Sequence, residues 1–173
     1  GNLTLTNING LCRIALDKLK KTYEQDIQEK NIRIVFDNLT LSLMMEVNVE
    51  QFSKVLAGIL KNSMYALLKK SETVTFSPEI FLGLKVTKDM LEITIRDNGS
   101  GIDENTKDKI FAPFFTTKTT GEAAGVGLYL CREIVQNHRG TIEVESKKGE
   151  YTQFLITIPV YQPKTITPPK EEE

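Results

Sequence analysis

Asp97 occupies a position in this sequence that suits the binding of a polar ligand. Residues 91–95 alternate apolar and polar side chains, which predicts a strand whose apolar face continues to Asp97. A carboxylate there is either a turn residue at the strand end or a buried acceptor, which needs a donor because unpaired burial is costly. Gly99 and Gly101 would let the backbone turn sharply and approach a flat ligand closely. Asp-Asn-Gly is also an ordinary turn sequence, so both interpretations stay open.

Asn62 is a second candidate ligand residue. It lies at the edge of the apolar stripe of a helix predicted over residues 49–70. Asparagine is a poor residue for a helix interior, because its amide competes for backbone hydrogen bonds. Its side chain therefore either caps the backbone locally or offers a neutral oxygen to a cleft. The second arrangement suits Mg²⁺ bound together with phosphates, because Mg²⁺ takes few protein ligands and keeps several waters.

A glycine-, threonine- and lysine-rich segment precedes another predicted helix. Residues 112–124 are too many and too small for a tight turn, so we expect a functional lid or disorder, with Lys118 able to reach phosphate oxygens from a lid. Gly125, Gly127 and Leu128 then open the helix, and exposed amides at a helix N-terminus bind anions. The alternative for these glycines is a flexible start to the helix.

Two polar residues fall on predicted apolar faces. Thr152 shares its strand face with Phe154, so its hydroxyl should point toward the core, where a backbone carbonyl or a ligand would satisfy it. His138, the single histidine, lies one turn after Ile134 near a helix end and is predicted to be structural or C-capping. A single histidine excludes a histidine cluster and a multi-histidine metal site.

The elements that must position these residues follow from hydrophobic periodicity. Helices are predicted at residues 8–27, 49–70, 104–111 and 126–137, and strands at 32–36, 41–47, 80–86, 91–95, 141–146 and 152–158. We expect one domain over residues 1–160 and a disordered tail in the Pro-, Thr- and Glu-rich residues 161–173.

Composition excludes several classes of function. The 173 residues carry 22 Lys and Arg against 23 Asp and Glu, a net charge of -1, which argues against a basic nucleic-acid-binding face. We expect no membrane span and no signal peptide. Cys12 and Cys131 lie in helical apolar patterns and should be reduced, as in the cytosol. No P-loop, Gly-x-Ser-x-Gly or Cys-x-x-Cys motif is present.

The order of these signals resembles a known family. Five motifs follow one another along the chain: Asn on a helix, Asp-x-Gly-x-Gly after a strand, Phe-Phe-Thr-Thr-Lys, Gly-x-Gly-Leu-x-Leu at the start of a helix, and Gly-x-x-Thr-x-Phe on a last hairpin. Over residues 3–160 the chain resembles the ATP-binding catalytic domain of bacterial sensor histidine kinases, in the gyrase, chaperone, histidine kinase and MutL superfamily. Asn-x-x-x-Ala-Leu and Pro-Phe-Phe-Thr-Thr-Lys resemble the nitrogen-regulator type.

The resemblance implies a fold and a role for each site residue. The fold would be an α/β two-layer sandwich, in which helices cover one face of a mixed sheet (the Bergerat fold). Asp97 would accept the adenine amino group, Gly99 and Gly101 would bring the backbone to the ring, Thr152 would assist through its hydroxyl or a water, and Asn62 would hold Mg²⁺. The phosphate tail of ATP would be bound by Lys118, Gly125, Gly127 and Leu128.

The implied activity is that of a protein-histidine kinase. The γ-phosphoryl group of ATP would pass to a histidine on a separate dimerisation domain absent from this chain, so we expect no catalytic residue here and no autophosphorylation by the chain alone. The implied partners are that dimerisation domain and a downstream response regulator, in the cytoplasm, without nucleic-acid or membrane contact by this domain. A parent protein anchored in the inner membrane is compatible with this assignment.

Three positions depart from the family pattern. Gly58 stands where such kinases usually have Asn and hydrolysing relatives often have Glu; Arg139 replaces a common Gly, and Tyr129 a small residue. Gly58 motivates an alternative function, a degenerate nucleotide-binding or interaction module with weak or no kinase activity. A serine kinase of anti-sigma type or a chaperone-like ATPase is disfavoured by the long lid and by the missing helical glutamate.

Overall fold

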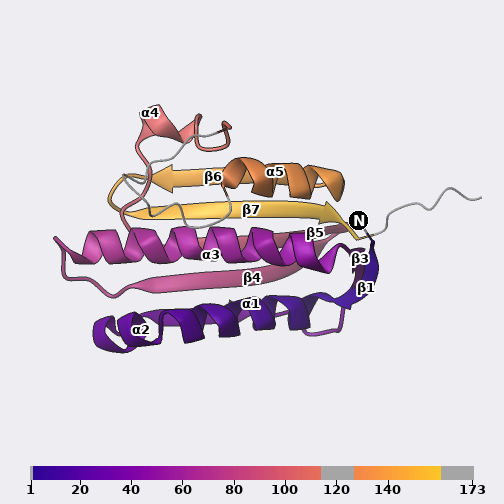
Figure 1. Ribbon diagram of the computed structural model, residues 1–173, viewed down its shortest axis with the longest axis horizontal. Coiled ribbons are helices and arrows are strands. Elements are labelled where there is room, and N and C mark those ends of the chain that lie inside the picture. Colours follow the sequence, from indigo (N-terminus) through magenta and orange to yellow (C-terminus); the bar gives the residue numbers. More distant parts are fainter. Residues whose placement is uncertain (1, 114–126, 161–173) are drawn as a thin grey trace, which may run out of the picture.

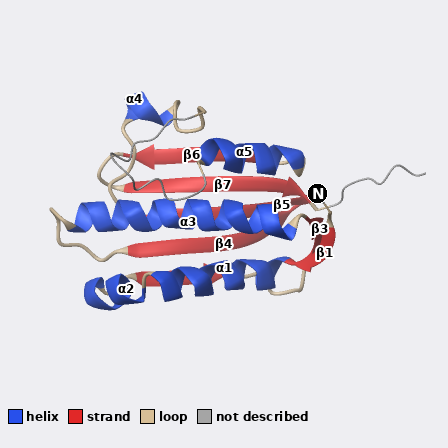
Figure 2. Ribbon diagram, viewed as in Figure 1, coloured by secondary structure: helices blue, strands red, loops and turns tan. Residues whose placement is uncertain are grey.

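The computed structural model describes residues 2–113 and 127–160, which form a layer of strands and a layer of helices (Figures 1 and 2). In chain order the elements are β1 (Thr4–Asn7), α1 (Ile8–Thr22), α2 (Glu24–Lys30), β2 (Arg33–Asp37), β3 (Met44–Val47), α3 (Val49–Ser71), β4 (Glu79–Thr87), β5 (Met90–Asp97), α4 (Glu104–Lys107), α5 (Leu128–Asn137), β6 (Thr141–Lys147) and β7 (Tyr151–Pro159).

The main sheet is mixed, as predicted. Its order is β2-β4-β5-β7-β6; β2 runs parallel to β4, and the other neighbours are antiparallel. A separate antiparallel pair, β1 and β3, lies near the N-terminus (Figure 1). Figure 1 shows α1, α3 and α5 side by side across one face of the main sheet, with α3 in contact with both neighbours. The predicted two-layer α/β sandwich is confirmed.

The core lies between α3 and the inner face of the sheet. The alternating residues that predicted this face are buried on the central strands, and the apolar stripe of α3 covers them. Each fully buried aliphatic or aromatic side chain contributes about 1.5–3 kcal/mol through removal from water. Fully buried side chains of this kind include Phe52, Leu56, Ile59, Ile80, Leu82, Leu91 and Ile93. The site described below therefore lies beside this buried core.

Several predicted boundaries were wrong. The helix predicted over residues 8–27 ends at Thr22, and Tyr23, at φ -112° and ψ 27°, separates α1 from α2. The Thr22 hydroxyl donates to the carbonyl of Lys18 (2.9 Å), a bond that competes with the helical ladder and bends helices. The strand predicted from residue 41 begins at Met44, and the helix predicted over residues 104–111 shrinks to α4. The short strand β1 was not predicted.

The end of α5 shows why the family pattern has glycine where this chain has Arg139. Arg139 has φ 61°, in the left-handed region that favours glycine. The amide of Gly140 then bonds to the carbonyl of Val135 (3.0 Å) and closes the helix. An arginine here bears a conformational strain that a glycine would not.

Cys12 and Cys131 are both buried and form no disulfide, in agreement with the sequence analysis. Within residues 2–113 and 127–160, no helix combines the length and apolarity needed to cross a membrane. Residues 161–173 lie outside the described residues, so the predicted tail and the domain boundary at residue 160 stay predictions.

Candidate functional site

Five of the predicted site residues line one cavity of about 370 Å³ between α3, the ends of β5 and β7, and the loop of residues 98–103: Asn62, Asp97, Gly101, Leu128 and Thr152. It falls within the size range of small-molecule sites. It is lined by Asn62, Tyr65, Ala66, Lys69, Asp97, Ser100, Gly101, Ile102, Asp103, Thr106, Ile110, Leu128, Lys148, Thr152 and Phe154. A second cavity, of about 300 Å³ between α1 and α3, contains none of the predicted site residues.

Asp97 is the buried charged residue on the wall of this cavity, with 2% of its surface exposed. One carboxylate oxygen accepts the amide of Gly99 (2.9 Å), so the residue both closes the turn and remains a buried acceptor. Burial raises the pKa of Asp97 from 3.8 to about 7, although the Gly99 bond, the Ser63 hydroxyl and the charges of Lys70 and Arg96 act in the opposite direction. Such a shift in a cleft is typical of functional carboxylates.

Ser63 is a site residue that the sequence analysis missed. It is 1% exposed and lies near enough to Asp97 to favour the ionised carboxylate. No hydrogen bond of good geometry joins the Ser63 hydroxyl to any described residue. The available signal was a serine, directly after Asn62, within an otherwise apolar helix stripe.

Asn98 fixes the turn that follows Asp97. Its side chain accepts the amide of Glu79 (2.8 Å) and donates to the carbonyl of Ser77 (2.8 Å), which ties the turn to the start of β4. The ammonium of Lys70 donates to the Asn98 carbonyl (3.0 Å) and ties the same turn to α3. These bonds hold the Asp97 backbone from two sides.

Gly99 and Gly101 are required by contacts within the protein. A Cβ on Gly99 would lie 2.5 Å from the carbonyl carbon of Ala66, and the next amide, of Ser100, donates to the Ala66 carbonyl oxygen (3.1 Å). Gly101 has φ +67°, and a Cβ there would collide with the carbonyl oxygen of Lys147. Gly101 also lines the cavity, whereas Gly99 does not. Close packing of the turn thus accounts for both glycines.

Asn62 faces the cavity from α3. It lines the cavity together with Tyr65, Ala66 and Lys69, at steps of three and four residues that mark one helix face. This position at the cavity favours the cleft alternative over local capping. Gly58 lies one turn earlier in α3 and is buried.

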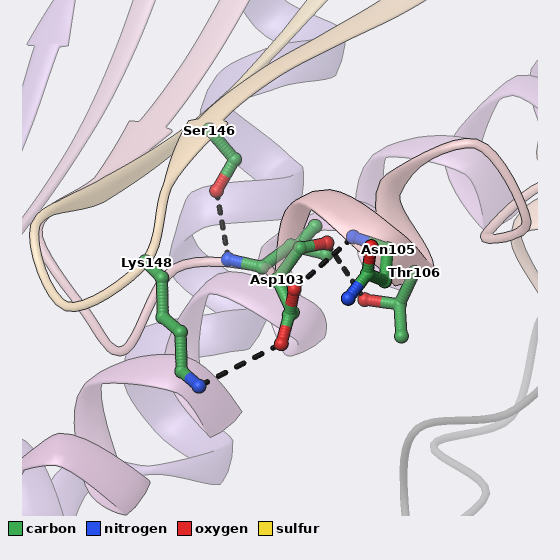
Figure 3. Close-up of polar contacts among 6 residues, drawn as sticks. Asp103, Asn105, Thr106, Ser146 and Lys148 are labelled. Carbon is green, nitrogen blue, oxygen red and sulfur yellow. Dashed lines mark hydrogen bonds and ion pairs between the residues drawn. The ribbon is translucent and has the colours of Figure 1, made fainter.

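Thr152 lies at the same end of the cavity as Asp97. The two residues are direct partners across β5 and β7, and Thr152 is 4% exposed. The Thr152 hydroxyl lies 3.0 Å from the Ser146 hydroxyl, so a side chain takes the place of the predicted backbone carbonyl, while Thr152 still lines the cavity. Ser146, another residue missed in the sequence, also accepts the amide of Ile102 (2.8 Å), as Figure 3 shows.

The N-terminus of α5 borders the cavity through Leu128. Gly127 is its N-cap and provides no side-chain cap, and a Cβ on Gly127 would meet nothing within 4 Å. Among the described residues nothing crowds this position, and the helix N-terminus carries a partial positive charge. Lys118 and Gly125 lie outside the described residues.

His138 is structural, as predicted. It is 3% exposed and ends α5, with Nδ1 2.8 Å from the carbonyl oxygen of Ile134. Its Nε2 accepts the amide of Asn48 (3.0 Å), the N-cap residue of α3. The Ile134 carbonyl requires the proton on Nδ1, so the ring joins the end of one helix to the start of another.

The donor set of the cavity fits Mg²⁺ bound with phosphates. Among the described residues, no group of three or more His, Cys, Asp or Glu side chains could hold a metal ion by itself. Asn62, with its neutral amide, lines the cavity, and the N-terminus of α5 borders it at Leu128, where a helix favours anions. Mg²⁺ typically binds one or two protein oxygens together with phosphates and waters, which matches this sparse set.

The comparisons with known proteins agree with this geometry. The sequence model of the family described as "Histidine kinase-, DNA gyrase B-, and HSP90-like ATPase" matches residues 48–162. Cyanobacterial phytochrome A of Nostoc sp. is 35% identical over 149 residues, covering 84% of this chain and 18% of the relative. Sensor histidine kinase ZraS of Escherichia coli (strain K12) is 29% identical over 136 residues, covering 79% of this chain and 27% of the relative. This chain thus spans less than a third of either protein.

A solved structure extends the match to the fold. The catalytic domain of histidine kinase ThkA superposes with a TM-score of 0.73 at 27% identity, covering 92% of this chain and 96% of that domain. The shared elements include those that build the cavity, since almost the whole of both chains is aligned. The chain therefore belongs to the family of histidine kinase-, DNA gyrase B- and HSP90-like ATPases, as an ATP-binding catalytic domain of the histidine kinase type.

Proposed function

We propose that this domain binds Mg·ATP in the cavity between α3 and α5 and donates the γ-phosphoryl group to a histidine on a separate dimerisation domain. The observation that carries the proposal is that the cavity wall has a negatively charged group and a positively polarised helix start at different places. A buried carboxylate, Asp97, lies at one end, and the start of α5, at Leu128, lies elsewhere on its wall. An adenine amino group would be complementary to the Asp97 carboxylate, and phosphates would be complementary to the start of α5.

Each residue has a separate task in this proposal. Asp97, when ionised, accepts the adenine amino group, and Thr152 supports that contact. Asn62 holds Mg²⁺, which when bound neutralises phosphate charge and orients the γ-phosphoryl group. The amides of Gly127 and Leu128 bind the phosphate tail. Lys118 and Gly125 are proposed from the sequence alone to assist there.

The chemistry itself involves a partner. An imidazole nitrogen of the acceptor histidine would form a bond to the γ-phosphorus as the bond to the β,γ-bridging oxygen breaks, which leaves ADP. Such transfers depend on positioning and charge neutralisation, so this domain supplies the oriented nucleotide and the dimerisation domain supplies the nucleophile. The buried His138, held by Asn48 and Ile134, is not the acceptor.

The finer assignments rest on similarity. One solved relative, at 26% identity and a TM-score of 0.68, is histidine kinase ThkA in complex with the response regulator protein TrrA. We propose that a response regulator likewise receives the phosphoryl group downstream of this chain, in the cytoplasm. The nitrogen-regulator-like subtype rests on the Asn-x-x-x-Ala-Leu pattern from residue 62.

A transfer assay tests the proposed function. The domain is mixed with the dimerisation domain of its parent protein and radiolabelled ATP, and acid-labile label on the dimerisation-domain histidine is measured. We expect label with wild type and its loss with Asp97→Asn. Absence of label with wild type that binds ATP would contradict the kinase assignment and leave only nucleotide binding.

Gly58 favours a second candidate, a degenerate module. Its lack of a side chain one turn before Asn62 removes a group that similar kinases carry at this position. If this candidate is right, wild type binds Mg·ATP too weakly to detect and Gly58→Asn restores binding. Tight binding by wild type removes the reason for the alternative.

A further inference from the structure

The Ser146 hydroxyl lies at the centre of a buried hydrogen-bond network behind the proposed adenine site. The residue is 9% exposed. Its oxygen is 2.8 Å from the amide nitrogen of Ile102, 2.7 Å from the carbonyl oxygen of Tyr151 and 3.0 Å from the hydroxyl oxygen of Thr152. Figure 3 shows the first contact, where Ser146 reaches the loop that leads to Asp103.

The chemistry of these groups fixes the direction of every bond. A serine hydroxyl has one proton to donate and two lone pairs. The Tyr151 carbonyl can only accept, so it receives the Ser146 proton. The Ile102 amide can only donate, and it takes one lone pair of Ser146. The remaining lone pair can be satisfied only by the proton of the Thr152 hydroxyl.

This direction determines what Thr152 presents to a ligand. Because the Thr152 hydroxyl donates its only proton to Ser146, it has only lone pairs to offer to a ligand in the cavity. Asp97, its direct partner on β5, is likewise an acceptor in its ionised form. With Asp97 ionised, this end of the cavity therefore accepts hydrogen bonds and donates none from these two side chains.

We propose that Ser146 is a positioning residue for base selection: by holding the Thr152 proton, it makes the base end of the cavity select a 6-aminopurine nucleotide over a 6-oxopurine nucleotide. An exocyclic amine donates into the acceptor pair, whereas a carbonyl oxygen at the same place would face lone pairs and leave buried groups unpaired. The inference rests on the proposed nucleotide site and deepens it.

Replacement of Ser146 need not detach the loop. The amide of Gly149 also bonds to the carbonyl of Ser100 (2.6 Å), and Lys148 forms an ion pair with Asp103 (3.6 Å, Figure 3). The ion pair is largely exposed and contributes little, but the backbone bond and the packing of Gly101 against Lys147 remain. Ser146→Ala therefore removes the proton acceptor for Thr152 while the turn keeps other attachments.

The test compares the dissociation constants of ATP and ITP at saturating Mg²⁺ for wild type, Ser146→Ala and Ser146→Thr. ITP places a carbonyl oxygen where ATP carries its amino group. We expect the ITP-to-ATP ratio of dissociation constants to fall by about tenfold in Ser146→Ala, because the freed Thr152 hydroxyl can donate, and to be retained in Ser146→Thr. Tyr151→Phe is the matched control, since it deletes an exposed hydroxyl of the same hairpin that bonds to Glu145.

Equal weakening of both nucleotides in Ser146→Ala, or an unchanged ratio, would overturn the inference and leave Ser146 a structural residue. If wild type binds neither nucleotide, the proposed function fails, and this inference with it. NMR of wild type provides a measurement that needs no variant. A slowly exchanging Thr152 hydroxyl proton close to the Ser146 side chain is expected, and rapid exchange with water would contradict the proton assignment.

Discussion

Asp97 and Thr152 are direct partners on the antiparallel strands β5 and β7, and both are buried at the same end of one cavity. The strand register alone brings them together, since their side chains share the inner face of the sheet. The proposed nucleotide site is therefore built on two central strands, and its Asp97 turn is held in place by Asn98 and Lys70.

ATP affinity should depend on pH through Asp97. Its pKa is raised to about 7, and only the ionised carboxylate accepts the adenine amino group. The affinity should therefore fall by about tenfold between about pH 8 and about pH 6, and binding near neutral pH should release a proton. Titrations at saturating Mg²⁺ in buffers of different ionisation enthalpy measure both quantities, since bound Mg²⁺ keeps the phosphates ionised. A constant affinity over this range would show that the ionised carboxylate is not the adenine acceptor.

Gly99→Ala should destabilise the domain. The added Cβ would lie 2.5 Å from the Ala66 backbone, which cannot move without disturbing α3. We expect a loss of about 1–3 kcal/mol in the free energy of unfolding, together with weaker ATP binding. Gly10→Ala in the first turn of α1 is the matched control, because its Cβ would meet Asn7 at an ordinary 3.7 Å. Denaturant unfolding measures both variants, and equal stability would mean that the Gly99 turn is looser than the structure shows.

Asn62→Ala should weaken ATP binding only when Mg²⁺ is present. If Asn62 acts through the metal, its removal costs about tenfold or more in affinity with Mg²⁺ and almost nothing in EDTA. The neighbouring residue Lys61 faces the other cavity, between α1 and α3, so Lys61→Ala is the control. An equal loss with and without Mg²⁺ would assign Asn62 to the nucleotide itself.

His138→Ala should reduce stability and leave ATP binding by the folded protein intact. The change leaves the Asn48 amide without its acceptor and opens a space beside Phe52, whose ring lies 5.5 Å from that of His138. We expect a loss of about 2–4 kcal/mol in the free energy of unfolding. The exposed Gln136, on the same helix, provides the control variant Gln136→Ala. Loss of ATP binding without loss of stability would contradict a purely structural role.

The sequence was sufficient to predict the parts of this fold that depend on long, regular periodicity. The helix of residues 49–70, the apolar faces of β5 and β7, and the inward direction of Thr152 follow from the periodicity of the side chains. The same periodicity placed Asp97 on the apolar face but left its burial open. The break at Tyr23 was missed because the apolar periodicity of two successive helices runs on through it.

The supporting polar residues were harder to predict. Ser63 and Ser146 are small side chains on otherwise regular elements, and only the tertiary structure shows that Ser63 lies near Asp97 and that Ser146 reaches Ile102. The steric need for glycine at position 99 was equally unpredictable, since the contact between Gly99 and Ala66 joins residues more than 30 positions apart. Contacts between distant segments leave no periodic trace in the sequence.

The central claim is that Asp97 receives the adenine of ATP in this cavity. Calorimetric titration of the domain with ATP at saturating Mg²⁺, for wild type and Asp97→Asn, tests it most directly. The account predicts saturable binding of one nucleotide by wild type and an affinity at least about a hundredfold lower for Asp97→Asn, because the amide places a donor against the amino group. Equal binding by the two proteins, or none by wild type, would contradict it.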